Sequence, residues 1–94
     1  MMTVADLLLH WRTENRKHVS IYPGEENIFH ARRDAVAKVI AGLFSVRVLT
    51  EEEHDSLFKL IHTRDVESIN LVETILETKD ISHLHEEQIY RLKY

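Results

Sequence analysis

The chain has no cysteine, one proline and two glycines among its 94 residues. Without cysteine, a disulfide framework, a thiolate nucleophile and a zinc site with sulfur ligands are all excluded. So few turn-forming residues argue against a fold of many short strands, which needs frequent tight turns. Residues that helices accommodate well, such as Leu, Ala, Glu and Lys, are common instead. The composition therefore favours an all-α protein.

Long apolar runs are also missing. No segment approaches the roughly 20 apolar residues that a membrane span needs. Asp6 interrupts the first apolar stretch and no basic region precedes it, which is unlike a secretory signal peptide. With 44% hydrophobic and 30% charged residues, the chain has the composition of an ordinary globular protein. We expect a single domain over residues 1–94, located in the cytoplasm and not associated with a membrane.

The net charge of −4 is unevenly distributed along the chain. Residues 1–47 carry seven Lys or Arg against five Asp or Glu, whereas residues 48–94 carry five against eleven. This asymmetry suggests self-association between unlike faces or docking on a charged partner. Solvated helices that simply differ in charge would give the same numbers, so both interpretations remain open.

The stretch Ile28–Phe44 has the longest helical periodicity, and the chain is organised around it. Its apolar residues recur at three- and four-residue steps and form one broad stripe. They are Ile28, Ala35, Val36, Val39, Ile40 and Leu43. We expect this helix to be covered by the others and to end near Ser45.

The remaining helices are predicted from their start signals. Thr3 with Asp6 and Thr50 with Glu53 fit capping boxes, and Asp65 fits an N-cap after a break near Thr63. We expect the first helix to run from Thr3 to Arg16–His18. A loop should follow at Val19–Asn27, held down by the apolar side chains of Ile21 and Tyr22, and a connector at Ser45–Leu49 should lead to a helix over Thr50–Ile61. The next helix starts at Asp65 and should be largely buried through Ile69, Leu71, Val72, Ile75 and Leu76, and a turn at Lys79–Ser82 then precedes a last helix over His83–Tyr94.

These elements predict a single compact bundle of four to five short helices. The brief connections suggest orthogonal packing. Because so short a chain builds a modest core, a second copy would supply useful apolar cover. We therefore also expect a homodimer.

Motifs for catalysis and cofactor binding are absent. There is no glycine-rich phosphate loop and no nucleophile motif, so we expect no enzyme, no catalytic residue and no cofactor. The seven histidines include His83 and His85, but residues two apart on a helix face different directions. His54 and His62 would lie about 12 Å apart along a helix axis, too far for one ion. We predict no metal site.

A candidate contact with a partner protein comes from the first two helices. Leu9 lies off the buried stripe near Arg12 and Arg16, although a single exposed leucine is common. Arg32 lies inside the apolar stripe of the central helix, which allows two interpretations. In the first, its side chain extends to solvent or pairs with an acid such as Glu25. In the second, it anchors a subunit or partner interface. The predicted partner-binding residues are Leu9, Trp11, Arg12, Arg16 and Arg32.

Nucleic-acid binding is the alternative, because basic residues concentrate on the same two helices. The candidate set is Arg12, Arg16, Lys17, Arg32, Arg33 and Lys38. Residues 35–61 also have the outline of a helix-turn-helix, but its second helix would begin with Glu51, Glu52 and Glu53. These carboxylates would repel phosphates where a recognition helix enters the groove. The basic patch, and not this motif, carries the alternative.

The segment Leu49–Glu53, followed by Leu57, Leu60 and Ile61, is similar to helix starts in many small bacterial and phage proteins. The resemblance implies a microbial accessory protein, either bacterial or of phage or mobile-element origin, and assigns no site residue. Our leading hypothesis is a small non-enzymatic interaction protein, an adaptor, regulator or inhibitor. The second hypothesis is a nucleic-acid-binding regulator that uses the basic first two helices.

Overall fold

A computed structural model describes residues 2–18, 24–63 and 65–94. In these ranges the chain forms five helices and no strand. They are α1 (Val4–His18), α2 (Gly24–Ser45), α3 (Glu51–Ile61), α4 (Val66–Glu77) and α5 (Glu86–Lys93). The predicted all-α bundle is thereby confirmed. None of the helices in these ranges has both the length and the apolar character needed to cross a membrane.

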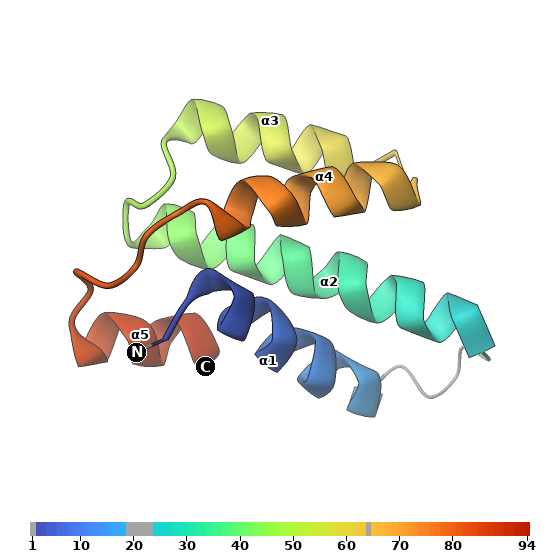
Figure 1. Cartoon of the computed structure of the whole chain (residues 1–94), viewed down its shortest axis with the longest axis horizontal. Helices are drawn as coiled ribbons and strands as arrows, with labels where there is room; N and C mark the ends of the chain where they lie inside the picture. The colour runs from blue at the N-terminus through green and yellow to red at the C-terminus, as the bar shows by residue number, and fades with distance from the viewer. Residues whose placement is uncertain (1, 19–23, 64) are drawn as a thin grey trace.

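The helices α1 to α4 run alternately back and forth along the longest dimension of the molecule (Figure 1), which measures 39 Å. Consecutive helices in this set thus run in roughly opposite directions. The physical reason is that a short connection reverses the chain directly, so consecutive helices become antiparallel neighbours. The helix α5 lies at one end, where it contacts α1 and α2.

The core is built on α2, as its apolar stripe predicts. Six of its aliphatic residues are at most 2% exposed, and the four larger ones pack in one cluster with buried residues of α1 and α4. At roughly 1.5–3 kcal/mol for each large aliphatic side chain, this burial is the main stabilising contribution. The six α2 residues are Ala31, Ala35, Val36, Val39, Ile40 and Leu43.

Three helix starts follow the predicted caps. Thr3 and Asp6 exchange hydrogen bonds through their side chains and backbone amides, and Thr50 and Glu53 do the same at α3. The Asp65 carboxylate accepts a hydrogen bond from the Glu67 amide at the start of α4. Because each cap uses residues within three positions, the local sequence was sufficient to predict it.

Two helix starts differ from the prediction. The helix α2 begins at Gly24, inside the expected loop Val19–Asn27. The expected plug of Ile21 and Tyr22 lies outside the described residues. The helix α5 begins at Glu86 and not at His83, because Ile81 is buried in the core and a turn follows it.

Two residues that were predicted to lie on the apolar faces of α4 and α5 are exposed. Leu71 of α4 was expected in the core but is 50% exposed. Tyr90 of α5 is 62% exposed. The apolar side of α4 is therefore narrower than half of the helix circumference.

Candidate interaction surface

A pocket of about 210 Å³ opens between α1 and α2, and we call it the arginine pocket. Its lining residues are Leu9, Arg12, Thr13, Arg16, Ala31 and Arg32. Four of the five predicted partner-binding residues lie here, on two helices that the 19–23 connection separates in sequence. Since arginine and apolar residues line the same hollow, it suits a partner that carries both acidic and apolar groups.

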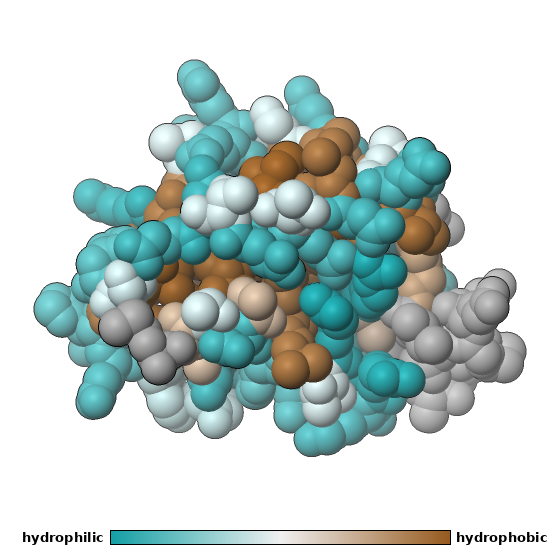
Figure 2. Space-filling view, viewed as in Figure 1, coloured by the Kyte–Doolittle hydropathy of each residue, from teal (hydrophilic) through white to brown (hydrophobic). Residues whose placement is uncertain are grey.

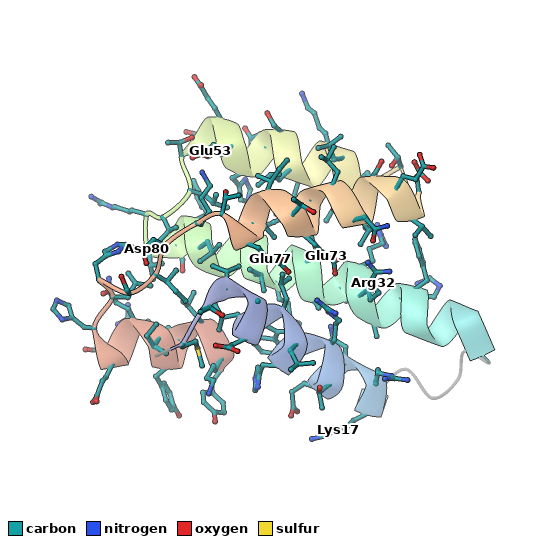
Figure 3. All side chains as sticks on the ribbon, viewed as in Figure 1. Lys17, Arg32, Glu53, Glu73, Glu77 and Asp80 are labelled. Carbon is teal, nitrogen blue, oxygen red and sulfur yellow. The ribbon has the colours of Figure 1, made fainter. Side chains whose placement is uncertain are left out.

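Glu73 of α4 lies behind the arginine pocket and is 8% exposed. Its Oε1 accepts a hydrogen bond of 2.5 Å from Arg32 Nη2, and Arg12 Nη2 lies 3.4 Å from its Oε2. Arg32 Nη2 also lies 2.5 Å from Asn70 Oδ1 of α4. Figure 3 labels Arg32 and Glu73 on the facing helices α2 and α4. One carboxylate thus connects α1, α2 and α4 through two guanidinium groups.

This geometry shows where the Arg32 side chain goes. Arg32 pairs with an acid, as one of the two sequence interpretations expected, but the acid is Glu73 and not one near Glu25 in the sequence. The contact of Arg12 is the looser one, because buried Arg12 Nε and Glu73 Oε2 have no hydrogen-bond partner among the described residues. Arg12 and Arg32 together carry one charge more than Glu73 neutralises.

Arg16 and Leu9 are the most available groups of the pocket. Arg16 is exposed and forms no ion pair or hydrogen bond with any residue that the structure describes. It lies one helical turn from Arg12, and such like-charge neighbours cost roughly 0.2–0.5 kcal/mol. Leu9 is 60% exposed at the pocket edge. Figure 2 shows hydrophobic side chains on this face of the molecule over α1 and, more extensively, over α3 and α4.

Trp11 lies away from the arginine pocket. Its indole N–H donates a hydrogen bond of 2.8 Å to the Leu92 carbonyl of α5, and Lys38 Nζ lies 4.3 Å from its ring centroid. His10 Nε2 lies 3.1 Å from the Lys93 carbonyl. Trp11 therefore attaches α5 to α1. The position of Trp11 next to Arg12 in the sequence did not indicate this contact.

The α5 contact also depends on Gly42. A Cβ atom at Gly42 would lie 2.8 Å from Leu92 Cδ2, closer than carbon atoms normally approach. The glycine in α2 thus lets the buried Leu92 side chain reach the core. This role explains a residue that otherwise weakens a helix interior.

The six cations predicted for nucleic-acid binding do not share one surface role. Lys17 pairs with Glu14 at 3.0 Å, and Arg33 Nε donates to the Ile61 carbonyl of α3. Lys38 lies over Trp11, and its Nζ is 3.4 Å from Asn15 Oδ1. Only Arg12, Arg16 and Arg32 line the arginine pocket.

A second pocket, of about 320 Å³, lies between α3 and α4, and we call it the acidic groove. Its lining residues are Glu52, Glu53, Ser56, Leu57 and Ile75. Lys79 Nζ donates to Glu53 Oε2 at 2.5 Å, and the Thr50 amide donates to Oε1. These hydrogen bonds, that of Lys79 first, lower the pKa of Glu53 below its ordinary value. Glu53 is thereby partly neutralised, whereas Glu52 is exposed.

The histidines are dispersed. The His54 ring stacks between Phe44 and Phe58, with ring centroids 4.5 Å and 4.7 Å away, and its Nδ1 lies 3.0 Å from Asp55 Oδ1. His83 and His85 are both exposed. Within residues 2–18, 24–63 and 65–94, no three His, Asp or Glu side chains come together in a way that could hold a metal ion.

Sequence reasoning missed Glu73 and Asn70. One signal was present for Glu73, because it follows Ile69 and Val72 and precedes Leu76 on the buried side of α4. A carboxylate at such a position needs a cationic partner. The identity of that partner was not readable locally, since Arg32 is 41 residues away.

Comparison with known proteins gives no relative: neither a family model, nor a curated protein, nor a solved structure matches the chain.

Proposed function

We propose that the chain is a non-enzymatic protein-interaction module of the cytoplasm, an adaptor, regulator or inhibitor, that binds its partner through the arginine pocket. The observation that carries this proposal is the exposed Leu9 beside three arginines in one hollow. An apolar anchor with arginine is a common centre of protein interfaces. Glu73 holds Arg12 and Arg32 in place, so less side-chain entropy is lost on binding.

Nucleic-acid binding is the weaker candidate. It is supported by the net positive charge of the pocket, but Lys17, Arg33 and Lys38 are engaged elsewhere. A protein partner also uses Leu9, which a phosphate backbone has no reason to contact. The geometry therefore favours a protein partner.

The test is affinity capture from cells with the wild type and the double variant Leu9→Glu/Arg16→Glu. The matched control is Leu71→Glu/Lys59→Glu, which makes the same chemical changes at exposed positions outside the pocket. We expect the pocket variant to lose the captured protein and the control to keep it. Equal capture by all three proteins would contradict the proposal.

A second measurement separates the two candidates. Binding of a mixed-sequence oligonucleotide is followed by fluorescence anisotropy over a series of salt concentrations. We expect no binding at low salt. Affinity that falls steeply with salt, and is lost in Arg16→Glu but not in Lys59→Glu, would favour the nucleic-acid candidate.

A further inference from the structure

We propose that the partner of the arginine pocket is a second copy of this chain, which presents its acidic groove. This inference rests on the proposed function and names the partner of the same pocket. It follows from two surfaces of one molecule that are opposite in charge and that both carry apolar groups. In the resulting contact, Leu9 enters the groove and Arg16 meets Glu52.

The charges of the two surfaces are opposite in sign. In the arginine pocket, Glu73 offsets one of Arg12 and Arg32, and Arg16 adds a further charge, which leaves +2. At the acidic groove, Lys79 offsets Glu53, and Glu52 forms no ion pair with a described residue, which leaves −1. Opposite patches of this kind attract each other and fix the orientation of docking.

The apolar groups also match. Leu9 protrudes from the edge of its pocket with 60% of its surface exposed. The acidic groove has an apolar floor of Leu57 and Ile75 and a volume of about 320 Å³, ample for a leucine side chain. Burial of Leu9 there would remove apolar surface from water on both copies. The central apolar contact would thus be surrounded by ion pairs.

The two surfaces lie on different helices, α1 and α2 for the pocket and α3 and α4 for the groove (Figure 1). We take each copy to use its pocket on one neighbour and its groove on another, a head-to-tail contact that forms rings or continuing chains. The association then grows with concentration. The homodimer expected from the sequence would instead require each pocket to meet the groove of the other copy at the same time.

The test uses two charge reversals, Arg16→Glu and Glu52→Arg, with Arg91→Glu, an exposed position of α5 outside both surfaces, as the control. Average mass is measured by sedimentation and light scattering over a concentration series at low salt, after circular dichroism has verified folding. We expect the wild-type mass to rise with concentration and to fall when salt is added. Each reversal should weaken association at least about tenfold, whereas the control should associate like the wild type.

Mixing the two reversed variants gives the decisive result. Within either variant, positions 16 and 52 carry charges of the same sign. In the mixture, the unaltered pocket of Glu52→Arg meets the unaltered groove of Arg16→Glu, and the two reversed positions carry opposite charges. We expect the mixture to regain the association that the separate variants lose. A mixture that stays monomeric would overturn the head-to-tail contact.

The result is separable from the test of the proposed function. A wild type that stays monomeric over the whole series overturns self-association. If the Leu9→Glu/Arg16→Glu variant nevertheless loses a captured protein of another kind, the interaction module stands with a different partner.

Discussion

At the scale of single residues, Glu73 determines how the arginine pocket is built. It is an acid on the buried side of α4, and its desolvation is compensated by Arg32 and, at a longer distance, by Arg12. The cluster leaves both guanidinium groups at the pocket wall. Arg32 therefore pairs with a buried acid and also lines the surface pocket. The interpretation of the sequence had treated pairing with an acid and a place at an interface as alternatives.

Replacing Glu73 with alanine should destabilise the protein by about 1–3 kcal/mol, because both guanidinium groups would lose the acid that they contact among the described residues. The loss should stay below that of a fully buried pair, since Arg12 and Arg32 can turn toward solvent. Glu77→Ala, on the same helix at an exposed position, is the control and should cost less than about 0.5 kcal/mol. Urea denaturation measures both. Equal losses would mean that the cluster contributes nothing to stability.

At the scale of helices, features that depend on residues close in sequence could be predicted, whereas features that depend on tertiary packing could not. The starts of α3 and α4 follow Thr50 and Asp65, whose partners are at most three residues away. The start of α5 depends on the burial of Ile81 against the rest of the core, which no local pattern encodes. The same holds for the arginine pocket. The exposure of Leu9 could be predicted from the helical periodicity, whereas the position of Trp11 outside the pocket follows from its contact with α5.

The cap of α3 gives a prediction at this scale. Thr50→Ala removes the hydroxyl that accepts from the Glu53 amide at 3.1 Å and should cost about 1 kcal/mol. Thr74→Ala, at an exposed position inside α4, keeps all helix caps and should change stability by less than about 0.5 kcal/mol. Thermal unfolding of the two variants distinguishes them. A Thr74→Ala loss as large as that of Thr50→Ala would contradict the role of the cap.

At the scale of the whole molecule, three carboxylates near helix starts and turns make stability depend on pH. Hydrogen bonds from Thr3, Lys79 with Thr50, and Ser82 lower the pKa values of Asp6, Glu53 and Asp80, respectively. Because each pKa is lower in the folded state, the stabilisation is complete above the ordinary values of 3.8 for the aspartates and 4.5 for the glutamate. It is lost as the pH falls through the lower folded-state values.

We therefore expect the unfolding temperature to fall as the pH is lowered from about 5 toward 2. The variant Asp6→Asn/Glu53→Gln/Asp80→Asn should be less stable than the wild type at neutral pH and should decline less steeply in acid. Glu67→Gln/Glu86→Gln/Glu87→Gln, which alters three exposed carboxylates at other positions, should follow the wild-type curve. Parallel curves for all three proteins would contradict this assignment.

The way α1 holds α5 has a consequence for redesign. The side chains of Trp11 and His10 bind the carbonyl groups of Leu92 and Lys93, at the end of a helix where carbonyls lack partners within the helix. Main-chain atoms are the same whatever residue carries them. Leu92 cannot be replaced freely, because its side chain packs against Gly42. Exposed positions such as Glu87 and Tyr90 do not have this restriction. The last helix is thus a scaffold on which foreign side chains, including a whole recognition motif, can be displayed while its attachment to the body is retained.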